Sequence, residues 1–141
     1  MRWFLYLHAN DVDASRTFYR DVIGLPEVFR SPEGDVVGFR AGDVQLTVAH
    51  HDGPAEPIDW AGQLGWEGGA AGVPSWGVEL DSAGFVRAVA AASAHGSRTR
   101  WPAPHWVGYW SFPVRDPMGN TVEISTPDRH AWTDPDSAGR R

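Results

Sequence analysis

The residues of this sequence that could exchange protons near neutral pH are one histidine and two carboxylates on predicted strands. His8 ends the first predicted strand, Glu79 lies in a later one, and Glu123 follows a turn, Asp116–Asn120, of sequence Asp-Pro-Met-Gly-Asn. Histidine titrates near neutral pH and a carboxylate can orient it, so His8 with Glu79 or Glu123 is a candidate general acid/base pair. With no cysteine, no nucleophile elbow and no glycine-rich phosphate loop, an acid/base isomerase or lyase is the enzyme class that remains.

Aromatic residues suggest a different chemistry, the stacking of a planar ligand. Eight tryptophans are the compositional outlier in a chain of 141 residues. Tryptophan buries a large area, so packing in cores and interfaces is its commoner role. Trp76 is expected in the core, whereas Trp106 and Trp110 are left open between core and ligand contact. Cation–π attraction would make such a surface favour cationic ligands.

Composition excludes several classes of partner. A net charge of −6 argues against nucleic acid, because phosphate binding needs a basic surface. The N-terminal apolar segment is too short to span a membrane, and no longer apolar run follows. The lack of cysteine fits a cytoplasmic protein. The partner that we expect is a small molecule, with neither nucleic acid nor a membrane involved.

Alternation of apolar and polar residues predicts a first module over residues 1–51, with a strand, a helix and three further strands. Asp11 or Asp13 can cap the helix, which ends at Gly24. His50 and His51 follow the last strand. Adjacent strand residues point to opposite faces, so one ion cannot easily bind both, and solvated loop histidines are the preferred interpretation. The expected strands cover residues 3–8, 27–30, 36–40 and 44–49.

Residues 75–126 repeat this order as a second module. Its helix is expected to be capped by Ser82 and to end at Gly96. The expected strands are 75–81, a short one at 98–101, a longer one at 107–114, and one that follows the Asp-Pro-Met-Gly-Asn turn.

Two segments lie outside the modules. Residues 52–74 are rich in glycine, proline and alanine and carry Trp60 and Trp66. A connector of this length with large aromatic residues is predicted to be a packed lid or a dimer contact. Residues 127–141 form a polar tail that we expect to be poorly ordered.

The repeated order predicts an α+β fold in which two βαβββ modules curl their free faces around a shared cleft. In each module apolar residues point to the helix, and polar or aromatic residues point to the cleft. The residues predicted to line the cleft are Phe4, Tyr6, His8, Gln45, Thr47, Ser75, Gly77, Glu79, Glu123 and Ser125.

Two motifs resemble the vicinal oxygen chelate superfamily, which includes glyoxalases, fosfomycin-resistance transferases, extradiol dioxygenases and bleomycin-binding resistance proteins. They are the segment 10–19, Asn-Asp-Val-Asp-Ala-Ser-Arg-Thr-Phe-Tyr, with Val-Ile-Gly-Leu at 22–25, and the segment 116–124, Asp-Pro-Met-Gly-Asn-Thr-Val-Glu-Ile. The resemblance covers about residues 3 to 126. It is specific for fold, whereas one fold hosts many activities.

The resemblance also implies where metal ligands would lie, one on each first strand and one on each fourth strand. Those positions hold Phe4, Gln45, Ser75 and Glu123. Phenylalanine cannot coordinate and serine is a poor neutral ligand, whereas the site needs three or four nitrogen or oxygen donors. The usual site is therefore predicted to be broken, and no cofactor is expected.

A shifted metal site is the weaker alternative. His8 lies four residues beyond Phe4 on the same strand face, and it could join Gln45 and Glu123, with Glu79 beside them. Four strand residues span about 13 Å, so His8 would enter the cleft at a different level from the usual ligand.

The resemblance then favours the metal-free, bleomycin-binding members, which are acidic, dimeric binders that stack flat drugs on aromatic side chains. By this comparison the protein is predicted to be a dimeric binder of a small aromatic molecule, including cationic ones, in a resistance or sequestration role. The alternatives left open are an enzyme of lyase, isomerase or dioxygenase type and an interaction module without a small ligand. The predicted ligand-binding residues are Phe4, Tyr6, His8, Gln45, Thr47, Trp60, Trp66, Ser75, Glu79, Trp106, Trp110 and Glu123.

Overall fold

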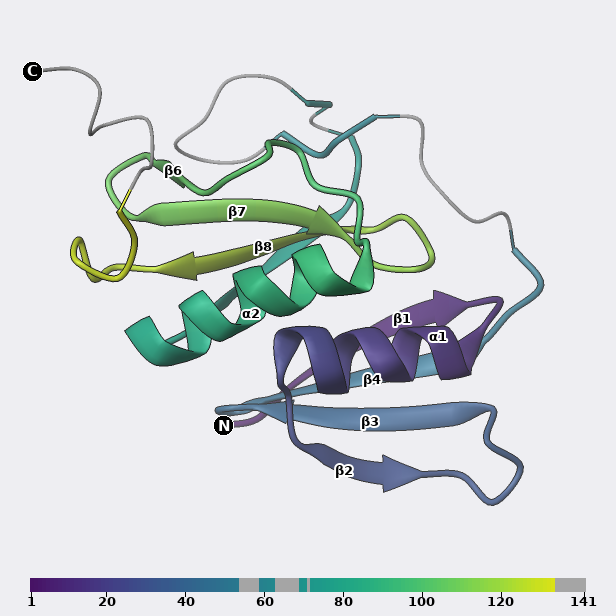
Figure 1. Cartoon of the computed structure of the whole chain (residues 1–141). Coiled ribbons are helices and arrows are strands. Elements are labelled where there is room, and N and C mark those ends of the chain that lie inside the picture. The colour runs from purple at the N-terminus through teal and green to yellow at the C-terminus, as the bar shows by residue number, and fades with distance from the viewer. Residues whose placement is uncertain (54–58, 63–68, 71, 134–141) are drawn as a thin grey trace, which may run out of the picture. The chain divides into compact units, whose positions relative to one another are not determined.

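A computed structural model describes residues 1–53, 59–62, 69–70 and 72–133. The chain forms two compact units (Figure 1). Unit 1 comprises Met1–Pro57 with Asp116–Asn120, and unit 2 comprises Ile58–Arg115 with Thr121–Arg141. Each unit has one four-stranded mixed sheet and one helical segment, which confirms the predicted α+β fold of two βαβββ modules.

The sheet of unit 1 has the strand order β1-β4-β3-β2. β1 runs parallel to β4, and the other neighbours are antiparallel. Leu46 and Val48 of β4 are buried on the helix side, as their alternation predicts. The strands are β1 (Trp3–Ala9), β2 (Glu27–Arg30), β3 (Val36–Ala41) and β4 (Val44–His50).

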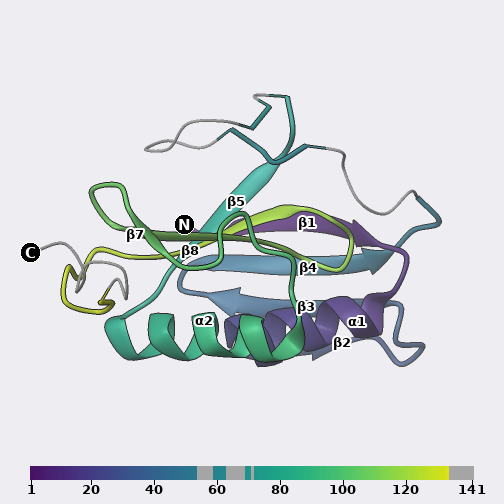
Figure 2. The ribbon, with the colours of Figure 1, turned by 45° about the horizontal axis from the view of Figure 1, so that its top comes forward.

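The helical segment of unit 1 changes type part of the way along. α1 (Val12–Thr17) is capped by Asp11, whose carboxylate accepts from the Ala14 N–H at 2.9 Å. It continues as the π-helix η1 (Phe18–Ile23), which the sequence pattern did not predict, and ends at the left-handed Gly24, as expected. Figures 1 and 2 show this segment on one face of its sheet, so the other face carries no helix.

The Asp-Pro-Met-Gly-Asn turn is held by its own aspartate. The Asp116 carboxylate accepts from the N–H groups of Met118 and Asn120, at 3.0 and 2.8 Å, and from the Asn120 side chain at 2.9 Å. It also accepts the Tyr19 hydroxyl of η1. Tyr19 and Asp116 are buried, so these bonds satisfy a carboxylate that would otherwise be costly to bury.

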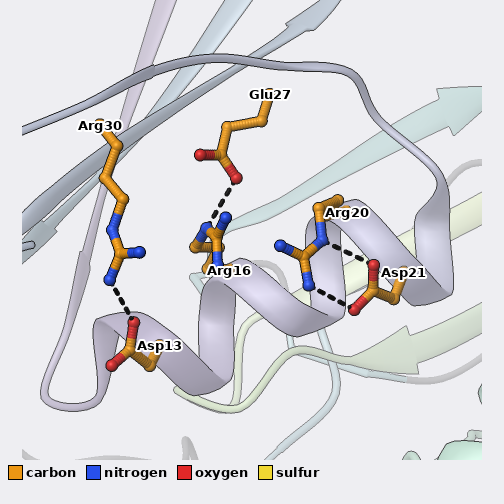
Figure 3. A network of polar contacts seen from close by, with 6 residues as sticks. All are labelled: Asp13, Arg16, Arg20, Asp21, Glu27 and Arg30. Carbon is orange, nitrogen blue, oxygen red and sulfur yellow. Dashed lines mark hydrogen bonds and ion pairs between the residues drawn. The ribbon is translucent and has the colours of Figure 1, made fainter.

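Ion pairs connect the helical segment of unit 1 to its edge strand (Figure 3). Arg16 and Glu27 are 2.7 Å apart, and Arg30 and Asp13 are 3.0 Å apart. Arg20 pairs with its own neighbour, Asp21. The two pairs between the helical segment and β2 hold this strand against the helix. All six residues have a partner of opposite charge, so their charges need no ligand to balance them.

Unit 2 repeats the topology with the strand order β5-β8-β7-β6. Its helix α2 (Ser82–His95) is uninterrupted and ends at the left-handed Gly96. Asp81, and not the predicted Ser82, is the N-cap, because its carboxylate accepts from the Gly84 N–H at 2.7 Å. The strands are β5 (Ser75–Glu79), β6 (His105–Trp106), β7 (Trp110–Arg115) and β8 (Thr121–Thr126).

Two strand predictions of this unit were wrong in their bounds. The segment 98–101 contributes only an isolated bridge between Thr99 and Val114, and the short strand is β6 instead. The long strand starts at Trp110, because Gly108 (φ +103°) makes a turn in which the Val107 N–H donates to the Tyr109 carbonyl. This turn closes the β6–β7 hairpin.

Part of the predicted polar tail packs against unit 2. Asp128 accepts the Ser82 hydroxyl at the start of α2, and the Trp132 ring lies edge-on to Phe85 at 6.4 Å. The expectation of poor order was therefore wrong for residues 127–133, and residues 134–141 lie outside the described ranges. Within those ranges no helix is long and apolar enough to cross a membrane.

Candidate functional site

Glu123 lies on the face of the unit 2 sheet opposite α2, the open face of this unit. It is half-buried, and one of its oxygens, Oε1, accepts the Tyr109 hydroxyl at 3.1 Å and the Ser111 hydroxyl. Within the described residues the carboxylate has no basic partner. Its negative charge is therefore stabilised by two neutral hydroxyl groups.

The environment of Glu123 also acts on Tyr109. Burial, then the negative charge of Glu123, then the hydrogen bond to that carboxylate raise the pKa of the Tyr109 phenol above its ordinary value. The phenol thus stays protonated and remains a donor at physiological pH. The two side chains form a stable donor–acceptor pair on an open sheet face.

Strand pairing places further polar groups beside this pair. His105, Ser111, Ser125 and Glu79 are successive register partners across all four strands, so they form one row on the open face. Both His105 and Glu79 are exposed. The predicted placement of Glu79 on the Glu123 face is confirmed.

Strand pairing changes which residue of unit 2 corresponds to Phe4 of unit 1. Glu123 pairs with Gly77, and Ser75 pairs with Thr121. In unit 1 the partner of Gln45 is Phe4, so the residue that matches Phe4 by pairing is Gly77 and not Ser75. A side chain at position 77 would approach the Glu123 backbone to 3.3 Å, and glycine leaves the second carboxylate oxygen uncovered on that side.

Trp60 covers one end of the same face. Its ring lies 4.4 Å from the guanidinium carbon of Arg115, and the neighbouring Ala61 N–H donates to the Thr121 hydroxyl at 3.2 Å. Gly69 permits this packing, because a side chain there would lie 2.4 Å from the Ala61 carbonyl oxygen. The described part of the connector thus packs against unit 2, whereas Trp66 lies outside the described residues.

Trp106 and Trp110 do not lie on the Glu123 face. They are register partners, and Trp110 pairs with Thr126, on the side of the sheet that α2 covers. Trp110 is only 8% exposed and its indole N–H donates to the Arg129 carbonyl at 3.1 Å. For these tryptophans, which the sequence left open between core and ligand contact, strand alternation gives the side of the sheet opposite Glu123.

The open face of unit 1 has a different character. Phe4 and Tyr6 of β1 are 56% and 66% exposed on the face without the helical segment, as predicted. Their partners are Gln45, which is half-buried, and Thr47, which is buried. Gln45 donates to the Thr47 hydroxyl at 3.4 Å, so its amide is turned along the strand. Two exposed aromatic side chains therefore lie beside two polar side chains on this face.

His8 lies on this same face, next to a histidine that the sequence pattern did not assign to it. The rings of His8 and His51 are 5.0 Å apart, centroid to centroid. His8 pairs with Ala49, and His51 is two residues further on, so the two are diagonal neighbours. His50 instead points away and bonds to Asp52 at 3.1 Å.

The residues at the family's metal positions do not fit a metal. Phe4 and Gly77 offer no donor, Gln45 is turned to Thr47, and Glu123 already accepts two hydroxyl groups. Among the described residues, no group of three or more His, Cys, Asp or Glu side chains could hold an ion. These positions are therefore not assigned a metal ion.

The shifted alternative fails within unit 1. Gln45 pairs with Phe4 and Ala49 with His8, so His8 and Gln45 are four strand positions apart. That offset is about 13 Å, too far for both to bind one ion at about 2 Å. The proposed metal set of His8, Gln45 and Glu123 is therefore corrected.

Comparison with known proteins agrees with this architecture. The model of the Glyoxalase/Bleomycin resistance protein/Dioxygenase superfamily matches residues 4–124. The chain belongs to this superfamily. The resemblance seen in the sequence motifs is thereby confirmed.

Several solved structures of the superfamily are similar to this member. A lactoylglutathione lyase from Agrobacterium tumefaciens is 28% identical, with a TM-score of 0.60 over 89% of this chain and 92% of that one. A glyoxalase/dioxygenase from Nostoc punctiforme is 19% identical, with a TM-score of 0.71 over 92% of each chain. Fosfomycin resistance protein FosX from Mesorhizobium loti is 15% identical, with a TM-score of 0.63 over 92% of each chain. The last two show the fold alone, and no curated protein matches the sequence.

Two site residues were missed at the level of sequence. Tyr109 and Ser111 are the hydrogen-bond donors to Glu123, yet neither was predicted to contact it. Their alternation with Trp110 was a usable signal, since residues two apart on a strand share a face.

Proposed function

We propose that this superfamily member binds a small, flat aromatic molecule, with a preference for cationic ones, through the open faces of its sheets. Glu123 is the observation that carries the proposal, because it is a half-buried carboxylate with hydroxyl donors and no basic partner among the described residues. A positive ligand group would complete its interactions better than a neutral one. Exposed Phe4 and Tyr6 supply aromatic surface for stacking.

Cleft residues predicted from sequence keep their roles in this proposal, with the changes that the fold requires. Ser75 and Glu79 share the face of Glu123, and Trp60 borders it. Trp106 and Trp110 lie on the other side of the sheet and have no role in this proposal. The role in resistance or sequestration belongs to the proposal.

The test is a titration with planar dyes in charged and neutral versions, followed by tryptophan fluorescence. Glu123→Gln should weaken binding of the cationic dye by about tenfold, the equivalent of roughly 1.4 kcal/mol, and leave the neutral dye unchanged. Glu79→Gln is the matched control on the same face and should have a smaller effect. Absence of dye binding, or equal loss of both dyes in Glu123→Gln, would refute the proposal.

A second candidate is an enzyme of lyase, isomerase or dioxygenase type, favoured by the 28% identity to a lactoylglutathione lyase. Its acid/base candidates would be His8 in unit 1, and Glu79 and Glu123 in unit 2. The assay is the isomerisation of the hemithioacetal of an α-oxo aldehyde and a thiol to the α-hydroxy thioester, by the wild type and His8→Asn. Turnover that His8→Asn abolishes while Tyr6→Phe retains it supports this function, and unchanged turnover in His8→Asn contradicts the assignment.

We also propose that the protein is a cytoplasmic homodimer. β1 is an edge strand with exposed aromatic residues, which in a monomer would be open to pairing with another chain. Light scattering at micromolar concentration should give about twice the mass of one chain. A monomeric mass would overturn the dimer.

A further inference from the structure

Two exposed imidazoles on unit 1 form a cluster, and one of them, His51, has no role in the proposed function. His8 projects from β1. His51 follows the end of β4, and its backbone N–H donates to the Ala9 carbonyl at 3.0 Å. Their ring centroids lie 5.0 Å apart with a tilt of 33°. Two segments that are distant in the sequence therefore bring two nitrogen ligands together.

Neither ring is committed to another partner in the described part of the chain. Among the described residues each of these two rings contacts the other, whereas neighbouring His50 bonds to Asp52 at 3.1 Å. Exposed rings can turn on a fast timescale, so the ligating nitrogen of each is free to change direction. This sets His8 and His51 apart from His50.

Gly53 places no side chain against the ring of His51. A side chain at Gly53 would lie 3.0 Å from the Nδ1 atom of His51, a contact that would crowd the ring. Glycine leaves this nitrogen open. Gly53 is thus a neighbour that keeps the imidazole accessible.

The geometry suits a borderline transition metal. Two imidazole nitrogens bound to one tetrahedral ion at 2.0–2.1 Å lie roughly 3.3 Å apart. Ring centroids 5.0 Å apart can reach this separation by rotation of the rings, without movement of the strands. Neutral imidazole suits zinc, copper and nickel better than magnesium or calcium.

We propose that His8 and His51 bind one divalent transition-metal ion, with water in the remaining coordination positions. This site is separate from the metal positions of the superfamily, since His8 lies four residues beyond Phe4, the residue at the family position on β1. It needs neither Glu123 nor the aromatic surface of Phe4 and Tyr6. The ion would link β1 to the segment that follows β4.

Isothermal titration of the untagged full chain with Zn²⁺ in a non-coordinating buffer tests the site. The wild type should bind one equivalent. His8→Asn and His51→Asn should each weaken the affinity by about tenfold or more, since even the loss of an outer-shell partner typically costs that much. His50→Asn is the matched control and should bind as the wild type does.

A thermal scan gives a second readout. Zn²⁺ should raise the melting temperature of the wild type and of His50→Asn, because the ion binds the folded state, and should not raise that of the double variant. Phe4→Ala should leave Zn²⁺ binding intact, which separates this site from the aromatic ligand surface. Wild-type affinity in the double variant, or equal loss in His50→Asn, would overturn the proposal.

Discussion

The two units share a topology but differ in the face that their helices leave open. Unit 1 presents Phe4 and Tyr6 beside Gln45 and Thr47. Unit 2 presents Glu123 with its hydroxyl donors. The helix-side positions are apolar in both, because each must pack against a helix. The repeat thus conserves the core pattern while the open faces carry different chemistry.

The helix sides differ as well. Unit 1 uses a short α-helix followed by a π-helix, whose Tyr19 bonds to Asp116. Unit 2 uses one continuous helix, and residues 127–133 pack at its start. Each unit therefore has its own buried or capping polar contact, and these contacts can be broken separately.

The largest expected effect comes from Trp110, which the structure assigns to the helix side of unit 2. Trp110→Ala should lower the free energy of unfolding by about 3–5 kcal/mol, because it removes a buried indole and its hydrogen bond. Urea denaturation measures this loss. Trp106→Ala, at a more exposed position, should cost about 1 kcal/mol. Equal small losses would return Trp110 to the list of ligand contacts.

Next in size is the buried contact of unit 1. Tyr19→Phe should lower the free energy of unfolding by about 1.5–3 kcal/mol, because the buried Asp116 loses a charge-assisted hydrogen bond. Chemical denaturation of this variant is compared with Tyr6→Phe, whose hydroxyl is on an exposed residue and should matter little. If both variants are equally stable, the Asp116 contact contributes nothing measurable.

A smaller effect is expected from Tyr109, and it depends on pH. Its folded pKa is raised above the unfolded value of about 10, so its stabilising contribution is complete below that pH and is lost as pH rises through the folded pKa. Glu123→Gln should lower the pKa of Tyr109, as followed by ring ¹³C resonances. The resonances of Tyr19 serve as the internal control. An unchanged Tyr109 titration would contradict the coupling.

The smallest effect concerns exposed Asp128. Its hydrogen bond from Ser82, then that from the His130 N–H, lower the pKa of this carboxyl. Its contribution is therefore present above its unfolded value and lost as pH falls through the folded pKa. Asp128→Asn should lower the melting temperature slightly at pH 7 and not at pH 2. A difference that persists in acid would point to packing instead.

Local patterns predicted much of the fold. The period-two alternation of Val44, Leu46 and Val48 identified a strand and its buried face, and Gly24 and Gly96 marked the helix ends. These signals succeed because burial and backbone conformation act over a few residues. The bounds of the β6–β7 hairpin were missed, because the turn at Gly108 competes with strand continuation.

The candidate site was predicted only in part. Alternation placed Phe4, Tyr6, Glu79 and Glu123 on open faces. It could not say that Tyr109 and Ser111 would meet Glu123, nor that Ser75 would be out of register with it. Pairing register depends on which strands meet, and a shift of one residue reverses the face of every side chain.

The sequence by itself determined the family, the two modules and the identity of Glu123 as a carboxylate on an open face. Only the tertiary structure decided its partners, the burial of Trp110, and the approach of His51 to His8. The physical reason is distance along the chain. Alternation and capping are local, whereas a contact between residues 8 and 51, or 109 and 123, exists only after strands far apart in sequence have paired.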